Sequence, residues 1–177
     1  MIRHLLATAV AAVVAVAAVA TAPGASADPM SDLIGMLPAG FAPESCHGTP
    51  NPVPHMLAGL ECTPVPGVVP GGKFEVFPDV DSLNHQFDVD FHGTYFKALT
   101  CPGAPGIGPG DLTAASGWKG RLACGWMGHF TDPAMGPVGE DAFGVMWTNE
   151  SRSFWGRVDG PDLGALFDWF GRVIVPS

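Results

Sequence analysis

Two stretches of the chain place apolar residues along one side of a helix. The first stripe consists of Val80, Leu83, Phe87 and Phe91. The second, after Gly160-Pro161, consists of Leu163, Leu166, Phe167 and Phe170. Apolar residues three and four positions apart share one helix face, so both stretches are predicted to be amphipathic helices. Asp79 or Asp81 can cap the first helix, and a shorter helix is expected over residues 31–36.

Five further stretches have the composition of short strands. They cover residues 56–65, 73–77, 121–127, 142–149 and 153–158. The last three alternate, and the residues that share a face are Leu122, Cys124 and Trp126; Phe143, Val145 and Trp147; and Phe154, Gly156 and Val158. Such alternation is typical of antiparallel strands, and residues 149–152 are few enough for a hairpin turn. The sequence therefore predicts an α+β fold, an antiparallel sheet with two amphipathic helices packed on it.

Residues 1–27 have the pattern of a cleaved export signal. Arg3 and His4 precede an apolar run over residues 5–20, and Ala25-Ser26-Ala27 forms a small-x-small cleavage site. The apolar run falls short of the roughly 20 residues that span a bilayer, so no membrane span is expected after cleavage. A signal retained as an anchor is the alternative. Residues 28–177 are then expected to form one exported domain, in the cell envelope or outside the cell.

The chain has four cysteines, Cys46, Cys62, Cys101 and Cys124, and all follow the predicted signal. An even number of cysteines in an exported chain indicates disulfide bonds. The pairs Cys46–Cys62 and Cys101–Cys124 each close a local loop, for which chain entropy gives about 3 kcal/mol of stabilisation. Spacing favours this pairing, and the two long-range pairings stay open. Zinc is disfavoured because the chain has no C-x-x-C.

The charge of the chain limits its partners. The formal net charge is -9 at pH 7, and removal of the signal with Arg3 makes it one unit more negative. An acidic surface repels polyanions, so nucleic acid is not expected as a partner.

Candidate chemistry is sparse. The chain contains no G-x-S-x-G and no H-E-x-x-H motif, and no motif indicates a cofactor, so none is expected. His85, Asp88 and His92 share the polar face of the first predicted helix, where they form a candidate metal cluster. A solvated polar face is the alternative. A pair of acids for hydrolysis is another candidate, and its members come from Asp132, Glu140, Asp141 and Glu150.

Two of the five tryptophans do not fit the predicted core. Trp169 lies off the apolar stripe of the second helix, and Trp155 points away from Phe154 and Val158. Both are candidate exposed rings that anchor a ligand or partner, because exposed aromatic side chains often do so. Burial under a loop is the alternative.

Several short strings carry a resemblance that spans nearly the whole chain after the signal. They are Leu37-Pro38-Ala39-Gly40-Phe41 followed by Cys46, Phe77-Pro78-Asp79, Cys101-Pro102-Gly103, Cys124-Gly125, Trp147-Thr148-Asn149-Glu150, and Gly160-Pro161-Asp162-Leu163 with Trp169. In these strings the chain resembles a family of small exported actinobacterial, chiefly mycobacterial, proteins. Similar domains form the extracytoplasmic part of membrane serine/threonine kinases. The resemblance implies a sensor-like or ligand-binding module and transfers no catalytic residue.

These observations favour a secreted, non-enzymatic domain. We expect it to bind a small apolar or envelope ligand, or a protein of the cell envelope. Two alternatives stay open. One is a secreted hydrolase that uses His and acidic residues near 128–150, and the other is a structural or host-interacting exported antigen with an exposed patch at Trp155 or Trp169.

Overall fold

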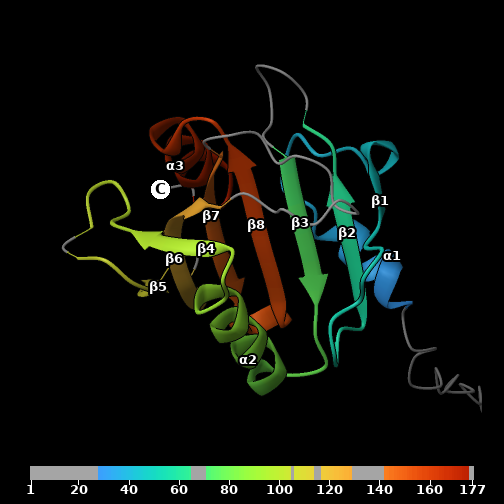
Figure 1. The fold of residues 1–177 in the computed structure, drawn as a ribbon. Helices are drawn as coiled ribbons and strands as arrows, with labels where there is room; N and C mark the ends of the chain where they lie inside the picture. Colours follow the sequence, from blue (N-terminus) through green and yellow to red (C-terminus); the bar gives the residue numbers. More distant parts are fainter. Residues whose placement is uncertain (1–27, 65–70, 105, 114–116, 129–141, 176–177) are drawn as a thin grey trace, which may run out of the picture.

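The computed structural model describes residues 28–64, 71–104, 106–113, 117–128 and 142–175 (Figure 1). The predicted export signal, residues 1–27, lies outside the described residues. Within the described ranges the chain forms three α-helices and two short 3-10 helices. They are α1 (Pro29–Gly35), η1 (Pro43–Ser45), α2 (Val80–Phe91), η2 (Glu150–Arg152) and α3 (Leu163–Val173). No helix in this part of the chain is long and apolar enough to cross a membrane.

Eight strands form one antiparallel sheet. They are β1 (Cys46–Gly48), β2 (Ala58–Cys62), β3 (Gly71–Val76), β4 (Phe96–Leu99), β5 (Gly110–Thr113), β6 (Lys119–Met127), β7 (Ala142–Asn149) and β8 (Phe154–Gly160). The order across the sheet is β1-β2-β3-β8-β7-β6-β4, and β5 pairs with the first half of β6. Because β3 lies beside β8, the third and the last strand of the chain meet near the centre of the sheet (Figure 1).

The predicted α+β fold is confirmed. The five predicted strands correspond to β2, β3, β6, β7 and β8, and the two long predicted helices correspond to α2 and α3. The predicted hairpin turn is η2, which joins β7 to β8. Besides the two expected helices, α1 also packs on the sheet, against β2 and β3.

The helices cover opposite faces of the sheet. In Figure 1, α2 lies in front of the sheet, and α1 and α3 lie behind it. We call these sides the α2 face and the α1/α3 face. The α1/α3 face buries a large apolar cluster that includes Leu33, Phe74, Val145, Trp147 and Phe170. The α2 face buries a smaller one that includes Leu83, Phe87, Met127, Met146 and Trp155. Alternation along each strand sends successive side chains to the two clusters.

Aspartate side chains cap the two long helices at their first residues. The Asp79 carboxylate accepts a hydrogen bond from the Ser82 backbone N–H at 2.7 Å, and Asp162 accepts one from the Ala165 N–H at 2.9 Å. Each bond satisfies a donor that the helix leaves unpaired at its start. Of the two predicted caps, Asp79 is therefore the actual one.

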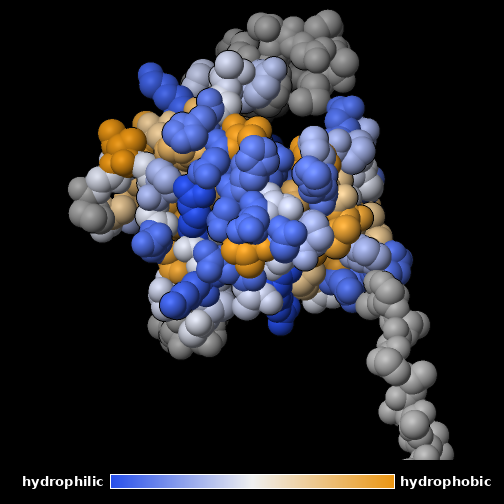
Figure 2. All heavy atoms as spheres, turned by 90° about the horizontal axis from the view of Figure 1, so that it is seen from below, coloured by the Kyte–Doolittle hydropathy of each residue, from blue (hydrophilic) through white to orange (hydrophobic). Residues whose placement is uncertain are grey.

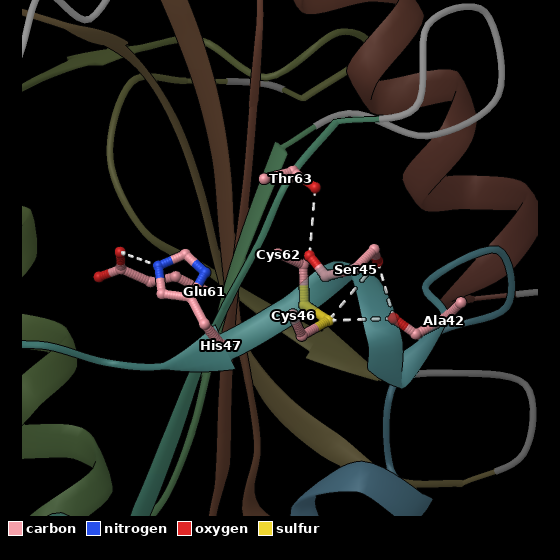
Figure 3. Close-up of a disulfide and its surroundings, with 7 residues drawn as sticks. All are labelled: Ala42, Ser45, Cys46, His47, Glu61, Cys62 and Thr63. Carbon is pink, nitrogen blue, oxygen red and sulfur yellow. Dashed lines mark hydrogen bonds and ion pairs between the residues drawn. A yellow bond between two sulfur atoms is a disulfide. The ribbon is translucent and has the colours of Figure 1, made fainter.

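Two disulfide bonds link neighbouring segments, as the favoured pairing predicted. Cys46 and Cys62 are paired positions of β1 and β2, with Cα atoms 4.0 Å apart. Cys101 is joined to Cys124 on β6, with Cα atoms 5.1 Å apart. Figure 3 shows the first disulfide on one side of the strand pair and the side chains of His47 and Glu61 on the other. The disulfides belong to the core of the α1/α3 face.

Candidate functional site

The expectation that Trp155 and Trp169 are exposed is wrong. The Trp155 side chain is 0% exposed, because α2 covers the face of β8 from which it projects. Trp169 is 6% exposed, and its ring meets that of Phe41 edge-on at a centroid distance of 5.8 Å. Neither ring is available to anchor a partner, so an exposed patch at these residues is also ruled out.

The candidate metal cluster is not assembled. His85 on α2 and His92, which caps the end of α2, are exposed, whereas Asp88 forms an ion pair with Arg121 on β6, with Oδ1 and Nη2 2.8 Å apart. The Arg121 guanidinium also lies 4.4 Å from the centre of the Phe87 ring. The residues that the structure describes contain no group of three His, Cys, Asp or Glu side chains placed to hold a metal ion. The polar face of α2 therefore pairs with the sheet and does not gather ligands.

Glu150 is the candidate hydrolytic residue that the structure describes. His129, Asp132, Glu140 and Asp141 lie outside the described residues. Glu150 is the first residue of η2.

A row of charged side chains crosses the α2 face beside α2. His47, Glu61, Lys73 and Arg157 occupy successive paired positions on β1, β2, β3 and β8. Lys73 Nζ lies 2.8 Å from an oxygen of Glu75, and the Arg157 and Lys73 side chains are each about one-fifth exposed. Lys73 Nζ and Arg157 Cζ lie 5.8 and 5.9 Å from the Trp155 ring centre. This side of the sheet therefore buries charge together with its apolar residues.

Glu75 is the most deeply buried of these charged residues, with an exposed fraction of 0%. Burial raises the pKa of its carboxyl above the ordinary value, and the Lys73 ammonium partly offsets the shift. Within the described residues, Glu75 Oε2 and the neighbouring Trp155 Nε1 have no hydrogen-bond partner. Burial likewise raises the pKa of Asp159, against the attraction of Arg157. The neighbouring cations therefore offset only part of the cost of burying the Glu75 and Asp159 carboxylates.

A cavity of about 250 Å³ lies on the α1/α3 face, partly open to solvent. Four segments distant in the sequence line it: the chain after α1, the residue before β6, the β7–η2–β8 hairpin and the end of α3. The lining residues are Met36, Leu37, Pro38, Ala39, Trp118, Trp147, Asn149, Arg152, Phe154, Val173 and Ile174. Trp147, which is 1% exposed, and Phe154 belong to the buried core, so the core itself forms the inner wall of the cavity.

The hairpin contributes Asn149 and Arg152, which have polar side chains, to the lining of the cavity. Asn149 ends β7 and is half-buried, and Arg152 ends η2 and is exposed. The Ser151 hydroxyl donates a hydrogen bond of 2.7 Å to Asn149 Oδ1. No ion pair or hydrogen bond of the Arg152 guanidinium occurs among the described residues. All other lining residues are apolar.

Sequence reasoning missed this site, because its residues are spread from position 36 to position 174. In the sequence, Arg152 belongs to a predicted hairpin turn, and Trp147 belongs to the apolar face of a predicted strand. Neither pattern indicates a ligand site. Two of the strings that carry the family resemblance, residues 37–41 and 147–150, contribute lining residues to the cavity. These two strings are the feature of the sequence that could have indicated the cavity.

The surface offers no competing apolar site in the view of Figure 2. Hydrophobic residues appear there in small groups among hydrophilic ones. The large exposed hydrophobic side chains of the described residues, Ile34, Leu57, Val89, Tyr95 and Ile107, are spread over different segments.

Comparison of the chain with protein-family models, with curated proteins and with solved structures finds no match. The resemblance to the exported actinobacterial proteins therefore stays a prediction.

Proposed function

We propose that this chain is an exported, non-enzymatic binding domain that holds the apolar part of a small ligand in the cavity of the α1/α3 face. The observation that carries the proposal is the cavity itself, whose walls come from four segments and whose described lining residues, apart from those of the hairpin, have apolar side chains. Ligand sites in proteins are concave and mostly apolar, with a few polar groups that orient the ligand.

The size of the cavity limits the ligand. An engineered apolar cavity of about 150 Å³ holds benzene, so on the same scale 250 Å³ corresponds to roughly ten carbon atoms. This is below the 300–1,000 Å³ of drug-sized sites. The ligand is then a small molecule, or a larger one that inserts a single chain or ring.

The lining residues support binding and not hydrolysis. Among the described residues, the lining includes no Ser, Thr, Cys, His, Asp or Glu, and so these residues supply no nucleophile and no general base. The two disulfides support the extracytoplasmic location, because such bonds persist in oxidising compartments. Four segments touch the cavity, so an occupant would brace α1, α3 and the hairpin against one another. Such bracing suits a sensor-like domain.

Titration of the protein with 1-decanol by isothermal calorimetry tests this function. Wild-type protein is expected to bind at one saturable site. Ala39 lines the cavity and is exposed, so Ala39→Trp should place its ring over the opening and weaken binding at least tenfold. Ala165→Trp, on the exposed side of α3, is the matched control and should bind as the wild type does. Absence of binding to the wild type, or equal loss in both variants, would contradict the proposal.

A further inference from the structure

One of the described residues that line the cavity has a charged side chain, and this side chain is exposed. Arg152 is exposed on η2, and the described residues give it neither an ion pair nor a hydrogen bond. We infer that the ligand carries a carboxylate, which binds the Arg152 guanidinium while the apolar part fills the cavity. This inference rests on the proposed function and specifies the chemical class of its ligand.

The guanidinium suits this role by its shape. Its planar fork of N–H donors matches the two oxygens of a carboxylate, and it stays charged at every physiological pH. A second donor lies nearby on the same hairpin. The Ser151 hydroxyl donates to Asn149 Oδ1. The Nδ2 group of the same amide is a hydrogen-bond donor, and it is the second donor on the hairpin. The polar rim of the cavity thus offers donors to an anion.

Backbone contacts of the turn fix the position of the Arg152 main chain. Ser153 follows it in the left-handed region, with φ of 45°, and the Ser153 N–H donates to the Glu150 carbonyl at 3.3 Å. The turn is anchored at both ends by the pairing of Asn149 with Phe154. A preorganised turn reduces the entropy that binding would otherwise cost.

Besides Glu150, which lies two residues before Arg152 on η2, two features of the chain oppose an anion, and both are weaker than the guanidinium. The C-terminal ends of α1 and α3 reach the cavity, and a helix C-terminus carries only about half a negative charge. Several of these carbonyls already accept N–H groups, as Phe170 does from Ile174 at 2.8 Å. The net charge of -9 repels anions at long range, but physiological salt screens such repulsion beyond about 8 Å.

A comparison of decanoate with 1-decanol at pH 7.5 tests the inference. Both ligands have the same chain, and only decanoate is charged. We expect wild-type protein to bind decanoate about fivefold more tightly, which is the upper end for a solvent-exposed ion pair. Arg152→Gln should remove this preference, so that the variant binds decanoate no more tightly than decanol. Arg172→Gln is the matched control, because Arg172 is an exposed cation of α3 that does not line the cavity.

The outcomes separate the inference from the function on which it rests. Equal affinities of the wild type for the two ligands, or a preference that survives Arg152→Gln, would overturn the carboxylate and leave the binding function standing. Tighter binding of decylamine than of decanoate would overturn it as well. Failure of all three ligands to bind would overturn both. Unchanged melting temperatures of the two variants would show that the substitutions act on binding and not on folding.

Discussion

The two faces of the sheet are buried in different ways. The α1/α3 face is lined by apolar residues such as Phe74 and Trp147, contains both disulfides and is hollowed by the cavity. The α2 face packs Trp155 beside the buried Glu75 and the half-buried Lys73 and Arg157. Burial of an incompletely paired charge costs more free energy than the loss of a few van der Waals contacts in an apolar wall. Among the described residues, the cavity lies on the face whose core cluster contains no charged side chain.

The largest effects are expected from the two tryptophans that the sequence placed on the surface. Trp155→Ala and Trp169→Ala should each lower the free energy of unfolding by about 3–5 kcal/mol, because each removes a buried ring from one of the two cores. Urea unfolding measures this, with Ile107→Ala as the control, since Ile107 is 72% exposed. Losses below 1 kcal/mol at the tryptophans would mean that their rings are in solvent.

Removal of the disulfides tests the cross-linked face. Replacement of Cys46 and Cys62 by alanine should cost about 3 kcal/mol through chain entropy, and so should replacement of Cys101 and Cys124. The second change should cost more, because Cys101 and Cys124 are both buried, whereas Cys46 is half-buried. Urea unfolding of the two double variants gives the order. A larger loss at Cys46 and Cys62 would contradict the assignment of the deeper core.

The charged face predicts a pH dependence of stability. Burial raises the pKa of Glu75 above its ordinary value of 4.5. Between the ordinary and the raised value, the folded protein keeps a proton that the unfolded chain releases. The free energy of unfolding therefore falls as the pH rises through this range and levels off above it. Glu75→Gln should remove this contribution.

Denaturant unfolding of wild type and Glu75→Gln from pH 4 to pH 8 measures the contribution of Glu75 to the free energy of unfolding. The difference should be smallest at pH 4, where Glu75 is largely protonated in both states, and should shift in favour of the variant as the pH rises. Asp159 contributes a slope of the same sign in both proteins, because burial raises its pKa as well. A difference that shifts in favour of the wild type would show that Lys73 outweighs burial.

The smallest effect is expected at the helix cap of α3. Asp162→Ala should cost about 1 kcal/mol, because it leaves the Ala165 N–H without its acceptor. Asp168→Ala is the control, since Asp168 is exposed on the same helix away from its start. Thermal unfolding compares the two. Equal effects would mean that loss of charge, and not loss of the cap, explains the change.

The parts of the fold that the sequence predicted are those with a clear period. The helices α2 and α3 have apolar stripes, and β6, β7 and β8 alternate. The missed strands β1, β4 and β5 have three or four residues each, and β5 is largely exposed, so no apolar alternation marks them. The disulfides followed from spacing because each joins segments that are neighbours in the sheet.

The error at Trp155 has a physical cause. Alternation placed its ring correctly on the side of β8 opposite Phe154, but alternation within one strand does not reveal whether a helix covers that side. Met146 on β7 and its paired residue Ala123 on β6 are also apolar, and together with Trp155 they indicate a second buried face. The cavity escaped prediction for a related reason: its walls come from segments whose meeting depends on the packing of α1 and α3.

The most direct test of the central claim is a methyl-resolved NMR titration with 1-decanol. The account predicts that methyl signals of Leu37, Val173 and Ile174, which line the cavity, shift in a saturable way. Leu83 and Met146, in the core of the α2 face, should keep their positions. Shifts confined to the α2 face, or the absence of any saturable shift, would contradict a ligand site on the α1/α3 face.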